Sequence, residues 1–286
     1  MAARRSRQGN SGQKPKKIGF LGATKRAAWA EFITPFERRL RELGWIDGHN
    51  VEIDYHWADG RQDRYGKIAK DLARDGVDVI VTSGTPAVLA AKNATKSIPI
   101  VFAAAGDPVR TGLVASLQRP GGNVTGLSNG QTELAGKRLD VLREAVPGLH
   151  TLGVLGNRAS ANVRLEMDEL EKRARTLGIE TIVCDVHNES QIAPALKKLK
   201  GKADALYVCT DPFIVHHRIS VNTLAAGLGL PTMHAFRDHI EDGGLISYGP
   251  NFRDMFGRAA ELVVNMAEAL GLKIPAALRR RADAAK

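Results

Sequence analysis

Residues 78–109 read DVIVTSGTPAVLAAKNATKSIPIVFAAAGDPV. Two apolar runs, at 77–83 and 98–105, flank an Ala-rich stretch at 86–96. Apolar runs that do not alternate with polar residues predict strands buried on both faces, and the stretch between them has the composition of a helix. A strand, a helix and a second strand in this order form a βαβ unit, whose strands are parallel. The stretch therefore predicts an α/β fold built on a parallel sheet.

The same alternation of strand and helix patterns continues on both sides of this unit. The further predicted strands lie at 17–23, 51–57, 123–128, 151–157, 179–185, 204–210, 230–236 and 245–249. The further predicted helices lie at 29–44, 62–75, 111–119, 132–146, 160–177, 189–199, 213–228 and 252–270. The ten strands divide into two runs of five near Ser128. This division favours two Rossmann-like lobes with parallel sheets over one large sheet.

The boundaries of the two lobes follow from this division. We predict that lobe 1 comprises residues 16–127 together with a closing helix at about 250–270. Lobe 2 would comprise residues 128–249. Two short crossings connect the lobes, at 128–131 and 249–251, and both are rich in Asn and Gly. These crossings are the predicted hinge.

The formal net charge of +10 first suggests a nucleic-acid partner. However, residues 1–17 carry six basic and no acidic residues, and residues 273–286 carry a net +4. The 30 basic and 30 acidic residues between them cancel. Because the positive charge lies on the two ends rather than on a folded face, we expect no nucleic-acid partner. We expect residues 1–15 to form a disordered basic tail and residues 271–286 to form a C-terminal tail.

Ligands of open parallel sheets bind beyond the carboxyl ends of the strands, so the segments that follow the strands are the candidate site. The clearest of these segments is 83–86, which reads Ser-Gly-Thr-Pro. Gly84 would turn the chain, Thr85 would be the N-cap of a helix and Pro86 its first residue. The free N–H groups of such a helix start, with the hydroxyls of Ser83 and Thr85, would bind a carboxylate or a similar anion. A plain capped helix is the alternative.

The same arrangement is predicted twice more, with Asp107 before Pro108 and Asp211 before Pro212. Asp211 could accept hydrogen bonds from an ammonium group on the ligand, and a role as a simple N-cap is the alternative. Taken together, the candidate ligand-binding residues are Thr24, Trp29, Ser83, Gly84, Thr85, Ala104, Gly106, Asp107, Asn157, Asp211, Phe213, Phe236 and Tyr248.

The sequence offers no motif of a known enzyme class. It contains no GxGxxG after a strand, no GxxxxGK[ST] phosphate loop and no GxSxG nucleophile turn. The residues most suited to metal or nucleophile chemistry are Cys184, Cys209, His216, His217, His234 and His239. None of them has a partner at metal-ligand spacing, and both cysteines lie in apolar runs typical of buried strands. We therefore predict no catalytic residue, no cofactor and no metal, and no run of about 18 apolar residues predicts a membrane span.

Several long segments resemble a known family. They are KKIGFLGAT (16–24), LRELGWIDGHNVEIDYHWADG (40–60), the stretch at 78–109, GLVASLQRPGGNVTGLSN (112–129), ADALYVCTDP (203–212) and GGLISYGPNF (243–252). In these segments the sequence is similar to a family of ABC-transporter substrate-binding proteins related to the tryptophan- and tyrosine-type binding proteins. The similarity extends over residues 16–260 or so, which is most of the chain.

The resemblance implies the type I periplasmic-binding-protein fold, a small organic solute in the cleft between the lobes, and delivery of that solute to ABC permease subunits. The expected solute is a carboxylate such as an amino acid or an aromatic acid. It implies that the loops at 83–85 and 104–107 hold the acid group of the solute. The loop at Asp211, with Phe236 and Tyr248, would complete the cleft from lobe 2. The resemblance also implies a periplasmic location.

The sequence departs from the family pattern at two places. Residues 1–17 carry charge but no apolar stretch, so we expect no working secretion signal in this sequence, and a cytoplasmic location is the alternative to the periplasmic one. After RAAELV (258–263) the family continues with a Pro-rich turn and a strand that we do not find here. We therefore expect a weaker connection between the lobes.

Two other classes of protein could use the same pattern of elements. A ligand sensor or transcriptional regulator of the lactose-repressor type would use the same two lobes without transport. It would need an N-terminal helix-turn-helix domain, and about 16 residues precede the first predicted strand. An α/β enzyme would need a nucleophile with a base, which the motifs do not provide. Solute capture for transport is therefore the predicted function.

Overall fold

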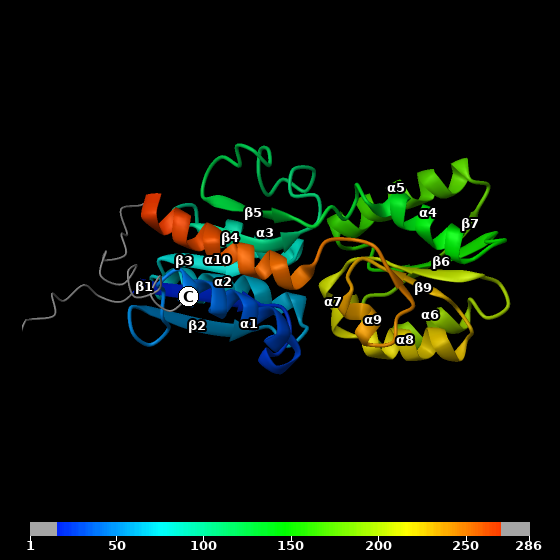
Figure 1. The fold of residues 1–286 in the computed structure, drawn as a ribbon, viewed down its shortest axis with the longest axis horizontal. Coiled ribbons are helices and arrows are strands. Elements are labelled where there is room, and N and C mark those ends of the chain that lie inside the picture. Colours follow the sequence, from blue (N-terminus) through cyan, green and yellow to red (C-terminus); the bar gives the residue numbers. More distant parts are fainter. Residues whose placement is uncertain (1–15, 270–286) are drawn as a thin grey trace, which may run out of the picture.

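The computed structural model describes residues 16–269, and within this range the chain forms ten strands in two parallel five-stranded sheets (Figure 1). The first sheet has the order β2-β1-β3-β4-β5 and the second the order β10-β9-β8-β6-β7. The strands of the first sheet are β1 (Lys16–Gly22), β2 (Val51–Trp57), β3 (Val79–Thr82), β4 (Ile100–Ala105) and β5 (Val124–Ser128). Those of the second are β6 (Thr151–Gly156), β7 (Glu180–Asp185), β8 (Ala205–Val208), β9 (Thr232–His234) and β10 (Ile246–Ser247). The predicted α/β class and the division into two runs of five strands are confirmed.

Helices cover both sheets. Lobe 1 is the first sheet with α1 (Arg26–Glu42), the short η1 (Gln62–Arg64), α2 (Tyr65–Arg74), α3 (Thr85–Ala94) and α10 (Phe252–Ala269). Lobe 2 is the second sheet with α4 (Ala135–Ala145), α5 (Ala161–Thr176), α6 (Glu189–Lys197), α7 (Pro212–His216), α8 (Arg218–Gly227) and α9 (Asp238–Glu241). The helix α10 follows lobe 2 in sequence but packs on α1 and β4, in lobe 1 (Figure 1).

The chain therefore passes between the lobes twice within the described range. We call residues 129–134 the first crossing, since they lead from β5 to α4, and residues 248–251 the second crossing, since they lead from β10 to α10. The predicted tails at 1–15 and 271–286 lie outside the described residues. So does most of the segment after 258–263 in which the sequence departs from the family pattern.

Each lobe has a hydrophobic core of its own. In lobe 1 the ring of Phe20 packs against those of Trp29 and Phe36, with centroid distances of 6.5 and 5.9 Å respectively. In lobe 2 the core is built of aliphatic side chains on both faces of the sheet, with Met167 and Leu206 fully buried. The core of lobe 1 also takes in Ala235 and Phe236 of lobe 2, so the lobes share one apolar contact. The rest of each core is separate, which allows the lobes to move as separate bodies.

The helix predicted at 111–119 is wrong, because the structure has a loop there. Gly112 has a φ of +73°, which a right-handed helix does not tolerate. The loop is held by other bonds: the Lys92 ammonium donates to the carbonyl oxygens of Gly112 and Leu113 at 2.6 and 3.1 Å. Asp107 accordingly caps no helix. It has a φ of +41° and accepts the Arg110 N–H in a turn.

The single helix predicted at 213–228 is also wrong, because the chain forms α7 and α8 with a break at His217. The carbonyl of Val215 accepts a main-chain N–H at the end of α7 and also accepts from the Arg218 guanidinium at 3.2 Å. No Gly or Pro marks this break in the sequence. The cysteines agree with the prediction, since Cys184 and Cys209 are both buried and free. Among the described helices, none is long and apolar enough to cross a membrane.

Candidate ligand-binding cleft

A cavity lies between the two lobes, at the carboxyl ends of the strands. About 510 Å³ between its lining atoms is free of protein, part of it open to solvent. Its walls are formed by Trp29, Phe32, Ser83, Gly84, Thr85, Ala104, Gly106, Asn129, Gln131, Asn162, Thr210, Asp211, Pro212, Val215, Phe236 and Phe252. Both lobes and the first crossing contribute, so a solute held here would contact all three.

The loop after β3 forms the polar wall on the side of lobe 1. The helix α3 begins at Thr85 with Gly84 as its N-cap, so the predicted cap at Thr85 is one residue too late. Gly84 has a φ of +88°, a conformation that favours glycine. Its N–H donates to the Ala104 carbonyl at 2.8 Å, which fixes this loop against the end of β4.

The hydroxyl protons of this loop are used within the protein. Ser83 Oγ donates to the carbonyl of Ala104 at 3.3 Å, and Thr85 Oγ1 donates to the carbonyl of Gly106 at 3.2 Å. Pro86 has no N–H, and the next two amides of α3 both donate to the Gly84 carbonyl. The Thr85 N–H is the first-turn donor that bonds no main-chain carbonyl of the described residues. A carboxylate would therefore be held here chiefly by a main-chain donor at a helix start.

Aromatic rings form the apolar wall. Phe32 from α1 and Phe252 from α10 meet edge to face with centroids 4.8 Å apart. Phe236, after β9, lies 4.6 Å from Phe252. Trp29 is 6% exposed and packs edge to face on Phe32. An aromatic or large aliphatic group would find offset and edge-on ring contacts here.

Asp211 is the one charged residue among the cavity's described lining residues. It is fully buried, and it caps α7 by accepting the N–H groups of Phe213 and Ile214, at 2.8 and 3.4 Å. Its other oxygen accepts the hydroxyl of Ser160 at 2.8 Å. Burial raises the pKa of Asp211, and these three hydrogen bonds oppose that rise. A buried carboxylate without a cation is costly, so this wall favours a positive group on the ligand.

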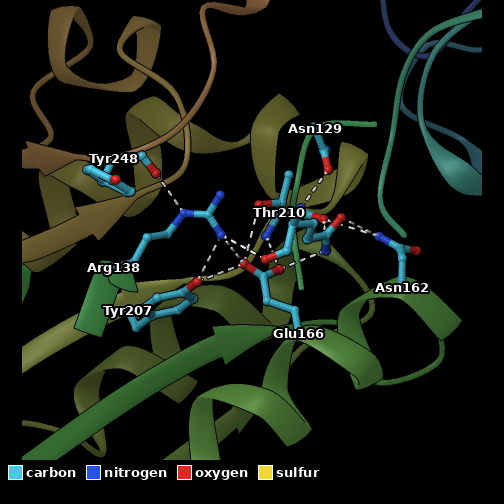
Figure 2. A network of polar contacts seen from close by, with 8 residues as sticks. Asn129, Arg138, Asn162, Glu166, Tyr207, Thr210 and Tyr248 are labelled. Atoms are coloured by element: carbon cyan, nitrogen blue, oxygen red, sulfur yellow. Dashed lines mark hydrogen bonds and ion pairs between the residues drawn. The ribbon is translucent and has the colours of Figure 1, made fainter. Parts of the chain in front are cut away.

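A network of buried polar side chains lies behind the lobe 2 wall (Figure 2). Glu166 on α5 accepts the side-chain N–H of Gln131 at 2.7 Å and the main-chain N–H of Thr210 at 2.8 Å. It also accepts the Tyr207 hydroxyl at 2.9 Å and pairs with Arg138 at 3.2 Å. Burial raises the pKa of Glu166, while Arg138 and the hydrogen bonds lower it. The network fixes two lining residues, Gln131 and Thr210.

One lining side chain has an acceptor left over. Asn162 on α5 donates to the Gln131 side chain at 3.1 Å and to the Thr210 carbonyl at 3.3 Å. Its Oδ1 is buried and accepts no hydrogen bond. Asn162 and Asp211 both belong to lobe 2 and both line the cavity. Together they offer acceptors to one donor group of a ligand.

Glycines allow the lobes to approach closely. A Cβ atom on Gly84 would lie 2.9 Å from Cγ of Pro212, and one on Gly60 would lie 3.0 Å from the ring of His216. A Cβ atom on Gly106 would lie 3.1 Å from Cβ of Asn162. In each pair the glycine belongs to lobe 1 and its neighbour to lobe 2. Side chains at these positions would hold the lobes apart.

The structure brings eight of the thirteen candidate residues into the cavity wall. They are Trp29, Ser83, Gly84, Thr85, Ala104, Gly106, Asp211 and Phe236. Asn157 and Phe213 lie instead in a second, more polar hollow between the lobes, which His187, His216 and His217 also line. Thr24 is buried beside this region, and Asp107 pairs with Arg110 at 3.6 Å. The Tyr248 side chain is 38% exposed, and only its carbonyl joins the network of Figure 2.

The candidate list lacked eight residues of the wall. They are Phe32, Asn129, Gln131, Asn162, Thr210, Pro212, Val215 and Phe252. Thr210, Pro212 and Phe252 lie in segments that follow strands, so the rule that chose the others also reaches them. Asn129 and Gln131 belong to the predicted hinge, and a hinge that also lines the ligand cavity is not visible in a sequence.

A sequence relative and two solved structures resemble this chain over most of its length. A tyrosine-binding protein of Clostridioides difficile (strain R20291) is 31% identical over 256 residues, which is 90% of this chain and 74% of the relative. The ABC domain from Streptococcus pneumonia in complex with L-Trp is 25% identical with a TM-score of 0.82, covering 93% of this chain and 98% of that chain. A substrate-binding protein with adhesive properties from Clostridium difficile, in its ligand-free, open structure, is 28% identical with a TM-score of 0.61, covering 91% and 96%.

The two solved structures differ in how well they superpose on this chain, although their identities and coverages are similar. The higher TM-score belongs to the structure that holds L-Trp, and the lower one to the open structure. The lobes of this chain are therefore placed more as in the ligand-bound relative, in agreement with the close approach at the three glycines. The two parallel sheets and these likenesses identify the fold as that of the type I periplasmic binding proteins.

The family model described as "ABC transporter substrate binding protein" matches residues 25–271 of this chain. This range includes both sheets except for the first strand, both crossings and all the residues of the cavity wall. The predicted resemblance and the predicted class of function, binding of a small organic solute, are confirmed. The chain belongs to the family of ABC transporter substrate-binding proteins.

Proposed function

We propose that this protein captures an α-amino acid with an aromatic or large apolar side chain in the cavity between its lobes. The proposal rests on the Asp211 carboxyl, which is fully buried in the cavity wall and has no cationic partner among the described residues. A ligand with an ammonium group would supply the missing charge. No other charged group lines the described wall, so the rest of the ligand should be neutral or should bond to neutral donors.

The three parts of such a ligand match three parts of the wall. Its ammonium group would face Asp211 and the unpaired Oδ1 of Asn162. Its carboxylate would face the loop after β3, where the Thr85 N–H is available at the start of α3. Its side chain would lie among the four rings of Trp29, Phe32, Phe236 and Phe252. The hydroxyls of Ser83 and Thr85 are predicted from the sequence to bind the acid group, but they donate to the carbonyls of Ala104 and Gly106. We therefore propose that these two residues mainly hold the loop in shape.

The relatives support the same class of solute. One is a tyrosine-binding protein, and another was solved in complex with L-Trp. Both amino acids carry an ammonium group, a carboxylate and an aromatic ring. We take L-tyrosine and L-tryptophan as the first ligands to test on this chain.

We propose further that the bound solute is delivered to the permease subunits of an ABC importer in the periplasm. The support is membership of the family, whose members are substrate-binding proteins. We propose binding without catalysis, because the family consists of substrate-binding proteins and the hydroxyls of Ser83 and Thr85 in the wall donate to main-chain carbonyls rather than to a base. In this proposal residues 16–127 with α10 move as one body and residues 128–249 as the other.

Calorimetry with a matched set of ligands tests the proposal. L-Tryptophan carries both charged groups, tryptamine lacks the carboxylate, and indole-3-propionate lacks the ammonium group. We expect L-tryptophan or L-tyrosine to bind most tightly, and the loss of the ammonium group to weaken binding by about 1.5–3 kcal/mol, as for a hydrogen bond to a charged group. Equal affinity for L-tryptophan and indole-3-propionate would refute the role of Asp211.

The variant Asp211→Asn separates the charge from the helix cap. Asn is as good an N-cap as Asp, so α7 should remain formed while the negative charge is lost. We expect this variant to lose its preference for L-tryptophan over indole-3-propionate. Asp204→Asn is the matched control, because Asp204 also accepts two main-chain N–H groups in lobe 2, from His150 and Thr151, but does not line the cavity.

A further inference from the structure

We propose that Arg138, together with Glu166, is a positioning residue that holds both crossings between the lobes against lobe 2 and so fixes the axis of the hinge. Arg138 would have this role whichever solute binds, because its buried guanidinium donates hydrogen bonds to both crossings.

Arg138 bonds to both crossings at once. Its Nη1 donates to the carbonyl of Gln131 in the first crossing at 3.0 Å. Its Nε donates to the carbonyl of Tyr248 in the second crossing at 2.8 Å. Gln131 and Tyr248 are far apart in the sequence, and Figure 2 shows the guanidinium between Tyr248 and the Glu166 carboxylate. Within residues 16–269 these two crossings are the only covalent links between the lobes, so one side chain ties both of them to α4.

The charge of Arg138 is balanced from within lobe 2. Arg138 is 1% exposed, and Glu166, 3.2 Å away on α5, is fully buried. Glu166 is itself fixed by the Tyr207 hydroxyl from β8 and by the Thr210 N–H just after it. The pair is thus anchored on the core of lobe 2 rather than on lobe 1. A rigid anchor of this kind gives the two carbonyls a defined position relative to the second sheet.

The hydrogen bonds from Arg138 limit which residues of the two crossings can rotate when the lobes move. If the carbonyls of Gln131 and Tyr248 move with lobe 2, rotation must be absorbed by the residues between them and lobe 1, at 128–130 and 249–251. Gly130 has a φ of +61°, in the region that favours glycine. A Cβ atom on Gly249 would overlap the carbonyl oxygen of Ala235 and lie 3.4 Å from Nη2 of Arg138. The second crossing therefore packs tightly on lobe 2 up to Gly249.

The same anchor also holds part of the cavity wall. Glu166 Oε2 accepts from the side chain of Gln131 and from the main chain of Thr210, and both residues line the cavity. A solute that contacts Gln131 therefore contacts the first crossing itself, next to the proposed axis. The geometry links occupancy of the cavity to the lobe 2 end of the hinge.

Hydrogen exchange of the ligand-free protein tests the proposal, so its outcome is independent of the proposed solute. The informative variant is Arg138→Lys, which keeps the charge opposite Glu166. A single ammonium nitrogen cannot reproduce the planar fork that reaches Glu166 and both carbonyls. The amides of Gln131, Leu134 and Tyr248 are all hydrogen-bonded in the crossings and serve as reporters. We expect them to exchange about tenfold to a hundredfold faster in the variant, as for the loss of hydrogen bonds to a charged group.

Two further variants make the test specific. Arg138→Met combined with Glu166→Gln removes both charges and leaves no unpaired buried charge. This double variant therefore tests the proposal even if Arg138→Lys fails to fold. We expect it to show the same faster exchange in both crossings. Arg173→Lys is the matched control: Arg173 on α5 pairs with Asp140 on α4 at 2.8 Å, so it joins the same two helices without touching a crossing. In Arg173→Lys we expect the reporter amides to exchange as fast as in the unaltered protein.

A residue that only stabilises lobe 2 would give a different pattern. Its loss would raise exchange equally in β6, β8 and the crossings, because the whole lobe would open more often. That uniform rise, or unchanged exchange at the reporter amides in both Arg138 variants, would overturn the proposal. Faster exchange confined to the two crossings, with β6 and β8 unaffected, is the result we expect.

Discussion

A Cβ atom on Gly106 would overlap Oε1 of Gln131. Gly106 directly follows β4 in lobe 1, Gln131 lies in the first crossing, and both line the cavity. We expect Gly106→Ala to weaken binding of L-tryptophan by about 1–3 kcal/mol, the usual cost of overpacking. Titration calorimetry measures the affinity. Gly106 has an ordinary negative or extended φ, so the added methyl group acts by its volume and not by backbone strain.

Gly66→Ala is the control for this variant. Gly66 lies in α2 of the same lobe, and a Cβ atom there would meet nothing within 4 Å. We expect its affinity for L-tryptophan to equal that of the unaltered protein. If Gly106→Ala binds as tightly as Gly66→Ala, the close approach of the lobes at Gly106 plays no part in binding.

The affinity for an amino acid should fall as the pH is lowered. Burial raises the pKa of Asp211 above the usual range of an aspartate, which is about 3.9. Only the ionised carboxylate attracts an ammonium group, so ligand binding competes with protonation of Asp211. The affinity should therefore start to decline at a pH higher than an ordinary aspartate would give. Calorimetry of L-tryptophan binding between pH 8 and pH 4 measures the decline, and Asp211→Asn should abolish it. A decline of the same steepness in Asp211→Asn would assign it to another group.

Ion pairs between the lobes should favour closure. Arg253 on α10 of lobe 1 pairs with Asp238 and Glu241 on α9 of lobe 2, at 2.9 and 2.7 Å. It also pairs with Glu31 on α1 at 2.6 Å. The three carboxylates lie within 4.8 Å of one another, so removing Arg253 leaves them to repel across the lobes.

We expect Arg253→Gln to weaken L-tryptophan binding about three- to tenfold, since these groups are partly exposed and such pairs contribute about 1 kcal/mol or less each. Adding Glu241→Gln should restore part of the loss by removing one of the repelling charges, since the ion pair that Glu241 forms is with Arg253. Arg39→Gln is the control, because Arg39 pairs with Glu261 on α10 at 2.7 Å within lobe 1. Equal affinities of Arg253→Gln and Arg39→Gln would mean that the pairs between the lobes do not contribute.

A buried pair of histidines should make lobe 2 less stable in acid. His234 and His239 lie with their Nδ1 atoms 3.1 Å apart, so a single proton can lie between these two atoms. Burial lowers the pKa of His234 to about 4, whereas an unfolded histidine titrates near 6.5. Between pH 6.5 and pH 4, His234 is therefore protonated in the unfolded state but mostly neutral in the folded state. The free energy of unfolding should fall by about 3 kcal/mol between pH 6.5 and pH 4 from His234 alone.

Urea unfolding at a series of pH values checks this expectation. The variant His234→Gln keeps a polar group beside His239 but cannot titrate in this range. Its free energy of unfolding should fall less steeply than that of the unaltered protein below pH 6.5. Parallel curves for the two proteins would show that His234 is not the cause.

The fold could be predicted from local sequence patterns, while much of the site could not. Continuous apolar runs such as that of β3 are buried on both faces of a sheet, and this constraint is visible in a single strand. Asp211 before Pro212 likewise carries a local cap signal, which the structure confirms. Arg138 lies in a helix reading AGKRLDVLREA, where nothing distinguishes it from the exposed Arg143. Its burial depends on Glu166 and Tyr248, which come from distant segments, as well as on the nearby Gln131.

The helix predicted at 111–119 is a case in which a local pattern predicts an element that does not form. Its apolar residues are spaced as in a helix, but the positive φ of Gly112 and the bonds from Lys92 fix a loop. A bond from a residue some 20 positions away is a tertiary constraint, and it overrides local propensity. At the break between α7 and α8 the Arg218 side chain donates to the Val215 carbonyl three residues before it. The distant constraint there is the pairing of Arg218 with Asp242 and Glu31.

The distance between the two lobes, with and without ligand, tests most directly whether they capture a solute by closing around it. Spin labels can be attached at Arg61→Cys in lobe 1 and Glu189→Cys in lobe 2, two exposed positions that line the second hollow between the lobes. The native cysteines, Cys184 and Cys209, are buried, so the label should react at the two new positions. Pulsed electron resonance would report the distribution of distances between the labels with and without saturating L-tryptophan or L-tyrosine. We predict a shift from a broad distribution of longer distances to a narrow one at the distance of the present structure. A ligand that binds tightly in calorimetry yet leaves the distribution unchanged would contradict capture by closure.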